Sequence, residues 1–546
     1  MKKIYKSLLL GCVCCCVTAT TLILLSCDKY LDVLPDNRAA LDTDSKITDL
    51  LISAYPETVD CMLAELYCDN TDRNEGSGYT AMTQSPFQEQ AATWQEITAI
   101  TQDTPYALWD HCYKAIGAAN NVIIAIDKLG RPDRLKAQLG EALLCRAFCH
   151  FRLSNIFCQA YSYKTCDQDL GITYITVPES EVSPVYERGT MAELYRHIEA
   201  DILEGLPLIS DNLHTVVKYH FNRKAACAFA ARFYLYYMQE DKSNLDKCIR
   251  YASEVIGADP SATLRDWETL GKIPINDAQR GNAFVSADDR ANLLILSTKS
   301  YWYYVFGATS LGMKYTHNDK IATSESIKAR GFWGDYNNYY FDVYTDSDKP
   351  KVMMYKLPQF MQIVDVTKNT GNPRMQIPVL TSDACIIDRA EAYALKGDYD
   401  KAYGDLTSWL HAFTRQTGTV DAALLEDVYG QSDDIGIDIP SGMTSKGMRY
   451  YTPTEPTPKK RLNPDFTVTE GEQENLIHAI LHARRVTTIH EGQRWQDVKR
   501  YGIEIYRRNI KDGNITVYDT MAKDDPRRAI QLPAQVIKAG ITPNPR

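Results

Sequence analysis

Apolar residues recur every three or four positions along most of the chain, which is the spacing of one face of an α-helix. The clearest apolar stripe is formed by Leu108, Cys112, Ala115, Ala119, Val122 and Ile126. Gly130 and Pro132 follow this stripe and predict the end of the helix, with Gly as the cap and Pro as the stop. A partner helix is predicted within 140–158, where its apolar residues share one face: Leu144, Phe148 and Phe151. Similar helical patterns return at 194–209 and 221–238, so the chain favours paired helices.

A helix-turn-helix pattern at 388–413 is the most specific of these signals. Leu395, Gly397, Tyr399 and Ala402 resemble the turn of a tetratricopeptide repeat, in which Gly permits a tight turn and the small Ala lets two helices approach. Residues 245–256 resemble another second helix of such a pair. The pairs are unevenly spaced, so we predict a mostly α fold built as a stacked solenoid of about four tetratricopeptide-like helix pairs.

Two stretches depart from the helical pattern. Residues 259–377 include the strand-like, aromatic segment 292–307 and the Gly-, Asn- and Tyr-rich segment 331–344. Residues 430–470 include four prolines within 450–464 and predict a loop. We therefore predict a scaffold over about 40–258 and 378–510 that carries an irregular, minor-β, ligand-binding insertion at about 259–377. Residues 27–546 then form a single domain.

The N-terminal segment predicts export and lipid attachment. Three lysines lie within 1–7, and an uncharged run of 18 residues follows at 8–25. Leu24-Leu25-Ser26-Cys27 has the large-apolar, small, Cys order of a lipobox, so we predict a signal peptide at 1–26 and a lipid anchor on Cys27, with fatty chains such as palmitate holding the protein to a membrane. Cys12 also fits the motif, but the apolar run before it is too short for a signal core. An ordinary anchor helix is the alternative.

Charge argues against nucleic acid as a partner. The 60 Lys and Arg residues face 70 Asp and Glu residues, for a formal charge of −10, and loss of the three lysines of 1–26 makes it −13. Binding to phosphate needs clustered basic residues, and adsorption to anionic lipid needs them too. The 35 tyrosines suit polar recognition surfaces, although a tyrosine-rich helical core is the more common use for any one of them.

The sequence contains neither a metal-binding cysteine or histidine motif nor a known catalytic motif. The ten cysteines after Cys27 form no C-x-x-C, and no paired His motif supplies a zinc site, so we predict free buried thiols, no metal and no cofactor. A Cys61–Cys68 disulfide is the open alternative. Motifs of nucleophilic, zinc-dependent and nucleotide-dependent enzymes are missing from the sequence, which predicts that the protein is not an enzyme. A carboxylate pair for glycoside hydrolysis would leave no sequence signature among 70 acids.

Four segments in order resemble the SusD/RagB family of outer-membrane nutrient-binding lipoproteins from polysaccharide-utilisation loci. They are the lipobox with CDKYLDVLPDN at 27–37, LWDHCYKAIGAANNVI at 108–123, GEALLCRAFCHFRL at 140–153, and ARRVTTIHEGQRWQDVKRYG at 483–502. The closing 527–545 resembles the family's terminal signature. The departures from the family pattern are Ala483, Thr487, His490 and Gln535. The resemblance implies helix pairs under a ligand-binding subdomain, a SusC-type TonB-dependent transporter as partner, and an outer-membrane location facing the cell exterior.

The E-G-Q-R-W segment is interpreted as fold architecture. Glu491, Arg494 and Asp497 stand three residues apart, which predicts ion pairs along one helix ridge, with Trp495 buried. Trp302 and Trp409 are also interpreted as core.

Aromatic residues in loops are the predicted ligand contacts, because sugar C–H faces stack on rings while hydroxyls pair with amides and guanidinium groups. The candidates are Trp94, Arg73, Trp333, Tyr336, Asn337, Asn338, Tyr339 and Tyr340. The competing interpretation is that Trp94 and Trp333 pin loops to the scaffold. The predicted function is a non-catalytic lipoprotein that binds oligosaccharides and passes them to the transporter. The alternatives are a peptide- or protein-binding helical-repeat lipoprotein and, as a further one, a glycoside hydrolase.

Overall fold

The computed structural model describes residues 41, 43–75, 85–177, 186–275, 277–307, 313–345, 351–368, 370–432 and 446–546. The predicted leader and Cys27 lie outside these residues. The chain divides into two compact units, 1–46 and 47–546, and the elements below belong to the second unit, apart from the start of α3 (Asp44–Leu51). None of the helices in the described ranges combines the length and the apolar content that crossing a bilayer would take.

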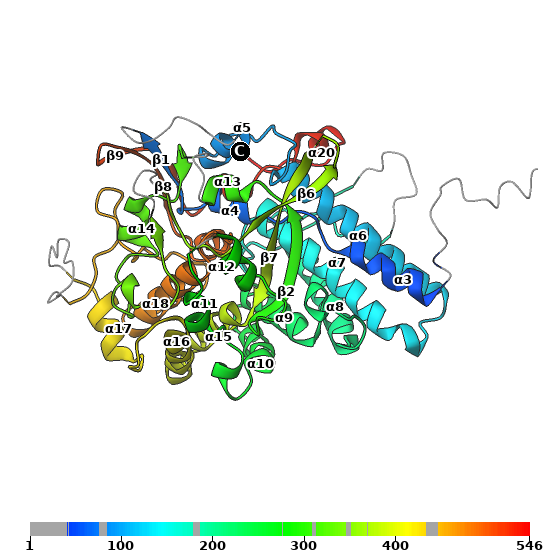
Figure 1. Cartoon of the computed structure of the whole chain (residues 1–546), viewed down its shortest axis with the longest axis horizontal. Coiled ribbons are helices and arrows are strands. Elements are labelled where there is room, and N and C mark those ends of the chain that lie inside the picture. The colour runs from blue at the N-terminus through cyan, green and yellow to red at the C-terminus, as the bar shows by residue number, and fades with distance from the viewer. Residues whose placement is uncertain are drawn as a thin grey trace, which may run out of the picture. The chain divides into compact units, whose positions relative to one another are not determined.

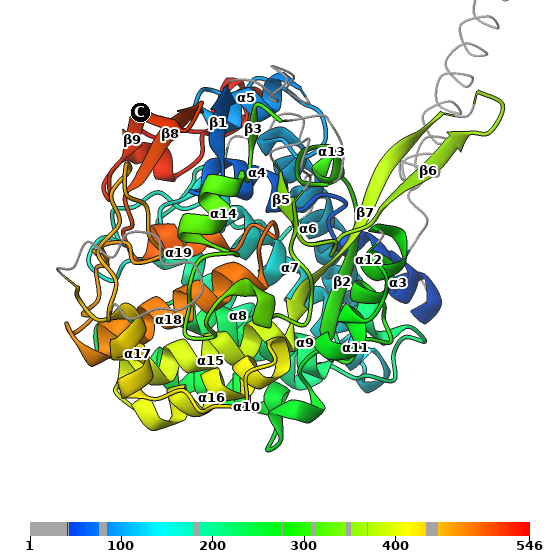
Figure 2. The same ribbon diagram turned by 60° about the vertical axis from the view of Figure 1, so that its left-hand side comes forward.

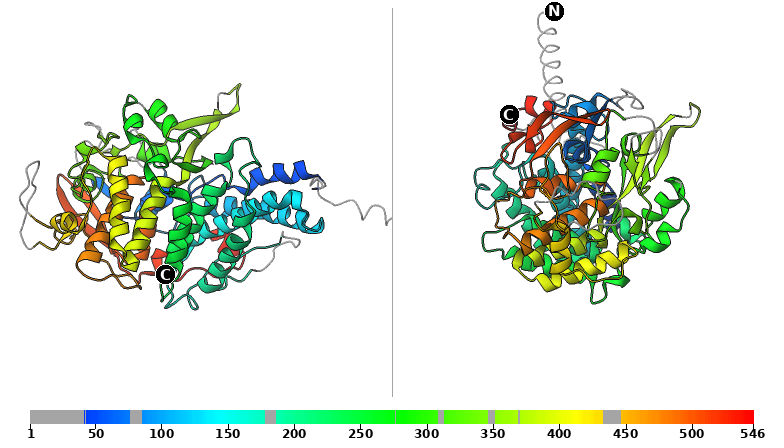
Figure 3. Two further views of the ribbon diagram at one scale, coloured as in Figure 1. Left: turned by 90° about the horizontal axis from the view of Figure 1, so that it is seen from below. Right: turned by 90° about the vertical axis from the view of Figure 1, so that its left-hand side faces the viewer.

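Eight long helices form the scaffold, and they lie in a row in the order in which the chain visits them (Figure 3, left). They are α6 (Pro105–Lys128), α7 (Lys136–Phe157), α8 (Met191–Gly205), α9 (Arg223–Tyr236), α10 (Asn244–Ile256), α15 (Ser382–Lys396), α16 (Tyr399–Phe413) and α18 (Glu472–Thr487). The helices pack as the pairs α6/α7, α9/α10 and α15/α16, with α8 against α7 and α18 against α15. The predicted mostly α fold of stacked helix pairs is confirmed.

The apolar stripe and the glycine turns that the sequence predicted are present in the structure. The stripe residues of α6 are buried, and Gly130 follows the helix with a left-handed φ of 79°. At the turn between α15 and α16, Gly397 has φ 84° and its amide caps the preceding helix. Ala402 is fully buried on α16, which packs directly against α15. The tetratricopeptide-like turn is thus formed as the pattern predicted.

Strands and short elements cover one side of the scaffold (Figures 1 and 2). A four-stranded sheet has the order β3-β1-β8-β9, a three-stranded sheet the order β2-β7-β6, and β4 pairs with β5. The strands are β1 (Asp72–Glu75), β2 (Asn292–Lys299), β3 (Tyr315–Thr316), β4 (Tyr344–Thr345), β5 (Val352–Met353), β6 (Gln359–Asp365), β7 (Thr370–Thr381), β8 (Ile505–Lys511) and β9 (Asn514–Met521). β1 and β8 are parallel, which brings residues more than 400 positions apart side by side.

Short helices lie between these elements along the described part of the chain. They are α4 (Cys61–Tyr67), α5 (Pro86–Ala92), α11 (Trp267–Gly271), α12 (Asp277–Phe284), α13 (Trp302–Phe306), α14 (Asp319–Glu325), α17 (Ala422–Tyr429), α19 (Arg494–Arg500) and α20 (Ala534–Lys538). The strand-like interpretation of 292–307 is correct for β2 but wrong for its second half, which forms α13. Trp302 there is buried and donates its indole N–H to the carbonyl of His490 at 2.8 Å, so a tertiary contact outweighs the strand preference of its aromatic residues.

The E-G-Q-R-W segment is structural, as interpreted, but its ion pairs are not those predicted. Glu491 precedes α19, so the three charged residues do not share a helix ridge. Each pairs with another segment: Glu491 with Lys356 at 2.5 Å, Arg494 with Asp69 at 2.7 Å, and Asp497 with Arg484 at 2.8 Å. Trp495 is fully buried. The motif is joined to three other segments of the fold through buried charges, which are costly to separate from their partners.

All ten cysteines after Cys27 are free and buried in this structure. Cys61 and Cys68 stand at the first residue and the C-cap of α4 and form no disulfide. Burial raises the pKa of both thiols well above the ordinary value, so they behave as small apolar groups.

Candidate functional site

Trp94 lies in the core and not on a loop surface. Its side chain is only 6% exposed, and its indole N–H donates to the carbonyl of Tyr67 at 3.0 Å. The guanidinium carbons of Arg507 and Arg527 lie 4.2 and 5.1 Å from the ring centroid. In this structure the ring therefore packs against two cations.

The predicted 331–344 segment forms a loop on α16 and α18, and two of its aromatic residues are buried. Trp333 is fully buried, with ring centroids 5.5 Å from Trp409 and 4.6 Å from His482. Tyr339 is 2% exposed and its ring lies 4.9 Å from Phe413. These two rings fasten the loop to the scaffold.

The other predicted members of this loop reach the surface. Asn337 is exposed, and Tyr336, Asn338 and Tyr340 are half-buried. The amide of Asn338 donates to the carbonyl of Trp333 at 2.7 Å, which ties the exposed part of the loop to its buried anchor. The two tyrosine rings each have a cation on one face: Lys328 lies 5.6 Å from Tyr336 and Arg415 lies 5.3 Å from Tyr340. We call Tyr336, Asn337, Asn338 and Tyr340 the tyrosine loop.

Arg73 lies on β1, in the sheet that also contains β8. Its guanidinium pairs with Glu75 at 2.6 Å, and the side chain is 38% exposed. The structure thus places the predicted residues in two groups. Arg73 and Trp94 are both close to β8, and the tyrosine loop with its buried anchors packs on α16.

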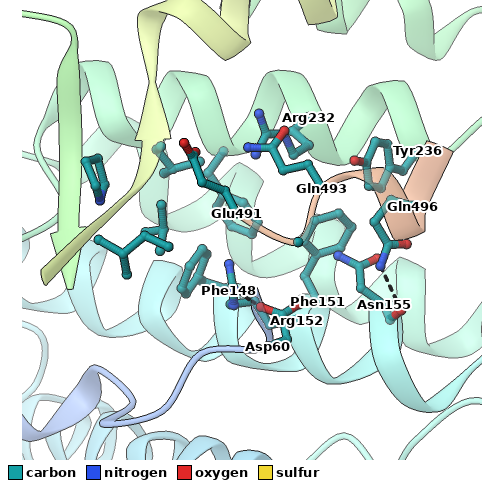
Figure 4. Close-up of a pocket in the computed structure, with 16 residues that line it drawn as sticks. Asp60, Phe148, Phe151, Arg152, Asn155, Arg232, Tyr236, Glu491, Gln493 and Gln496 are labelled. Atoms are coloured by element: carbon teal, nitrogen blue, oxygen red, sulfur yellow. Dashed lines mark hydrogen bonds and ion pairs between the residues drawn. The ribbon is translucent and has the colours of Figure 1, made fainter. Parts of the chain in front are cut away.

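A pocket that sequence reasoning did not identify opens between helices α7 and α9, strand β7 and the 491–496 segment (Figure 4). The space between its walls is about 620 Å³, solvent at the mouth included. Its aromatic walls come from the two helices and its polar groups from all sides: Phe148, Phe151, Phe229 and Tyr236, with Asp60, Arg152, Asn155, Arg232, Glu491, Gln493 and Gln496. Apolar walls with a few convergent polar groups are typical of small-molecule sites.

Most polar groups of this pocket are already paired. Arg152 pairs with Asp60, and Arg232 pairs with Asp388 at 3.0 Å. Burial, with Arg232 nearby, lowers the pKa of Arg152 to about 10, so the guanidinium stays charged at neutral pH. Among the described residues, two buried atoms in the pocket have no hydrogen-bond partner, the donor Nε of Arg152 and the acceptor Oε1 of Gln493.

One donor and one acceptor match the chemistry of a hydroxyl group. A hydroxyl both donates and accepts, so a hydroxyl group is able to pair with either of these atoms. A carboxylate only accepts and would leave Gln493 Oε1 without a donor.

A second group of polar residues also escaped the sequence analysis. Glu141 on α7 is 1% exposed, and its two carboxylate oxygens contact His214 Nε2 at 2.7 Å and His220 Nδ1 at 2.8 Å. Burial opposes ionisation of Glu141, but the hydrogen bonds from both imidazoles hold the pKa of this carboxyl below its usual value. The structure thus brings together three side chains that could hold a metal ion, a grouping that the sequence analysis did not predict. The residues are separated by 73 and 6 positions, and that spacing matches no metal-binding motif.

Comparison with known proteins places the chain among SusD-type structures. Residues 29–235 match a SusD-like family described as starch-binding and associating with the outer membrane. A SusD superfamily protein from Bacteroides thetaiotaomicron is 15% identical with a TM-score of 0.57, over 92% of this chain and 98% of that one. A SusD superfamily protein from Bacteroides vulgatus is 17% identical with a TM-score of 0.57, over 92% and 97%.

A SusD-like carbohydrate-binding protein from Bacteroides vulgatus is 14% identical with a TM-score of 0.54, over 88% of both chains. At these identities the structures establish a shared fold. No curated protein sequence matches the chain. The match over 29–235 confirms the resemblance to the SusD family for the part of the chain that includes the segments at 108–123 and 140–153, and the solved structures confirm the expected fold.

Proposed function

We propose that this chain, as a protein of SusD-like fold, is a non-catalytic lipoprotein that binds glycans at the outer membrane and passes them to a SusC-type TonB-dependent transporter. The observation that carries the proposal is the match of residues 29–235 to a family described as starch-binding and associating with the outer membrane. The acidic charge agrees with an uncharged ligand and gives no support to a nucleic acid.

The tyrosine loop is the proposed surface for the glycan. Exposed Asn337 and half-buried Asn338 offer amide donors and acceptors, and the rings of Tyr336 and Tyr340 offer apolar faces beside cations. Trp333 and Tyr339 act beneath them as anchors that hold the loop in place. A rigid aromatic surface loses little conformational entropy on binding. In the second group of predicted residues, near β8, we propose Arg73 as a polar contact for the glycan. Trp94 stabilises the fold around it.

The pocket of Figure 4 is the proposed second contact, for one sugar unit. Its unpartnered Arg152 Nε and Gln493 Oε1 fit a hydroxyl, and Phe148 and Phe151 supply apolar walls. Leaving both polar atoms unpaired costs about 1–3 kcal/mol for each, which a hydroxyl would recover.

Retention in affinity gels tests the glycan proposal. Soluble starch, other neutral polysaccharides and acidic polysaccharides are compared, and a neutral glycan is expected to slow the protein. The double variant Tyr336→Ala/Tyr340→Ala should weaken retention if the loop binds, and Gln493→Ala should weaken it if the pocket binds. Tyr518→Ala is the matched control, since Tyr518 is a 42% exposed tyrosine on β9. Failure to retain any glycan, together with capture of peptides, would favour the peptide-binding alternative.

Incubation with the retained glycan tests the absence of catalysis. New reducing ends appearing in proportion to the amount of protein would establish the hydrolase alternative instead.

Palmitate labelling tests the anchor. Cys27→Ala should remove the label, while Cys12→Ala should keep it. Co-purification of a TonB-dependent transporter from detergent-solubilised membranes tests the proposed partner.

A further inference from the structure

Glu141, His214 and His220 converge on one point from three segments of the chain. Glu141 projects from α7, His214 comes from the segment that follows α8, and His220 precedes α9. The potential ligand atoms of the three side chains all lie within 4.8 Å of one another. Two imidazoles and one carboxylate are the ligand set of many zinc sites.

The two imidazoles are stacked on each other. Their ring centroids lie 3.5 Å apart with an interplanar angle of 11°, and each directs one nitrogen at the same carboxylate. The two nitrogens therefore lie within hydrogen-bond distance of separate oxygens of the Glu141 carboxylate, on neighbouring parallel rings. A cation beside this carboxylate would have one nitrogen of each ring within reach.

A second set of contacts fixes the carboxylate. Tyr55 donates its hydroxyl to Glu141 Oε1 at 2.8 Å, and the same hydroxyl accepts the amide of Phe221 at 2.6 Å. The ring of Tyr55 packs edge-on against His220 at 5.6 Å. Such outer contacts orient metal ligands and are a regular part of metal sites.

One of the three proposed ligands is buried, and the other two are partly exposed to solvent. The Glu141 side chain is 1% exposed, while those of His214 and His220 are 13% and 15% exposed. An ion can therefore reach the imidazoles from solvent, and a water can complete a four-coordinate shell. Zinc holds nitrogen and oxygen ligands at about 2.0–2.2 Å, which places them about 3.3 Å apart, so the 2.7 and 2.8 Å contacts need only a small opening.

We propose that Glu141, His214 and His220 bind one Zn²⁺ ion, which ties the segment between α8 and α9 to α7. This inference does not depend on the proposed function, because the site shares no residue with the tyrosine loop or the pocket. The role is structural: the ion would bridge α7 and the segment that holds His214 and His220, which lie 73 and 79 positions after Glu141. Tyr55 is a positioning residue that acts through Glu141.

Zinc titration of the purified, chelator-treated protein tests this. Metal content after gel filtration should reach one Zn²⁺ per chain, and the melting temperature should rise with added Zn²⁺. Replacement of zinc by Co²⁺ should give the visible absorption of a tetrahedral site. The double variant His214→Ala/His220→Ala should bind no zinc at this site, and Tyr55→Phe should weaken binding by about tenfold or more.

His411→Ala is the matched control, because His411 is an exposed histidine that contacts only the carbonyl of Gly418 at 2.9 Å among the contacts described for it. It should retain full zinc stoichiometry. Circular dichroism of the metal-free variants verifies that they fold, and His214→Gln/His220→Gln replaces the alanine pair if that pair unfolds. Wild-type protein that retains no zinc after gel filtration would overturn the proposal, as would equal stoichiometry in wild type and a folded double variant.

Discussion

The guanidinium carbon of Arg507 lies 4.2 Å from the centroid of the Trp94 ring, and both residues bind the end of the same helix. Arg507 donates to the carbonyls of Leu66, Tyr67 and Cys68, and Trp94 donates to that of Tyr67. These carbonyls end α4, where a helix carries partial negative charge and lacks internal partners. Trp94 and Arg507 thus form a cap that joins α4 to strand β8.

Replacing Trp94 is expected to destabilise the fold. Trp94→Ala removes a large buried ring and an N–H donor, and should lower the free energy of unfolding by about 3–5 kcal/mol, measured by urea denaturation with circular dichroism. Trp94→Phe should cost less, because it keeps most of the ring volume. Phe360→Ala, at a 39% exposed aromatic residue on β6, is the control and should change stability by less than about 0.5 kcal/mol. Equal urea midpoints for Trp94→Ala and wild type would refute the capping role.

Gly492 and Gly513 allow the cost of a close backbone contact to be separated from the cost of a left-handed conformation. Their φ angles are similar, 84° and 81°. A Cβ on Gly492 would lie 2.7 Å from the Cα of Cys61, whereas one on Gly513 would have no atom within 4 Å. In both Ala variants the left-handed backbone conformation should destabilise the fold by about 1–2 kcal/mol. Only Gly492→Ala must also displace α4.

Thermal unfolding of the two variants tests this directly. Gly513→Ala should lower the melting temperature slightly, and Gly492→Ala should lower it clearly more, by an added cost of about 1–3 kcal/mol. Equal shifts would mean that the backbone of α4 moves away at no cost.

The helical scaffold could be predicted because its signals are local. The α6 stripe, Gly130 and the Leu395–Ala402 turn depend on residues within a few positions of each other, and each forms as expected. Local patterns of this kind determine helix limits without knowledge of the rest of the fold.

The candidate sites could be predicted only in part because they depend on long-range pairing. An aromatic residue in a Gly- and Asn-rich stretch has the same sequence signal whether it faces solvent or, like Trp333, packs on Trp409. Glu141 meets His214 only because the segment after α8 returns to α7. No spacing rule encodes such a meeting, since the separation of 73 residues is set by the path of the chain and not by one element.

Glu391 is expected to support stability down to acidic pH. It is fully buried and accepts from Arg484 at 2.5 Å, Arg500 at 2.7 Å and the hydroxyl of Tyr501 at 2.7 Å. Burial opposes its ionisation, but the two arginines lower the pKa of Glu391 to about 2. Because this pKa is below that of the unfolded chain, the stabilisation is complete above about pH 4.5 and is lost as the pH falls toward 2.

The variant Glu391→Gln measures this contribution. At neutral pH this variant leaves the buried guanidinium groups of Arg484 and Arg500 without the negative charge of Glu391. We therefore expect the free energy of unfolding, measured by urea denaturation, to fall by about 3–5 kcal/mol. The difference from wild type should shrink below about pH 4, as Glu391 becomes protonated in the wild type. Glu268→Gln removes an acid that pairs with Lys272 and is 54% exposed, and it should change stability by less than about 1 kcal/mol. A pH-independent cost of Glu391→Gln would contradict the assignment.

Asp103 has the opposite dependence, because it is buried without a cation among its described contacts. Its carboxylate accepts from Ser300 Oγ at 2.6 Å and from the amide of Tyr301 at 2.7 Å. Burial raises the pKa of Asp103 to about 7, although both hydrogen bonds favour the charged form. The folded state therefore takes up a proton near pH 7, while the unfolded chain does so near 3.8, so the contribution of Asp103 to stability improves as the pH falls from about 8 to about 5.

Asp103→Asn isolates this effect, because asparagine keeps the shape and tolerates the left-handed φ of 66° at this position. Near pH 8.5 the variant should be at least as stable as wild type in urea denaturation, since it avoids burying a charge. Near pH 5 the free energy of unfolding of wild type should have risen relative to that of the variant. Burial also raises the pKa of Glu65 to about 7, but that group is present in both proteins and cancels in the difference. A difference between the two proteins that stays constant from pH 5 to 8.5 would mean that Asp103 remains ionised, and that its two hydrogen bonds outweigh the cost of its burial.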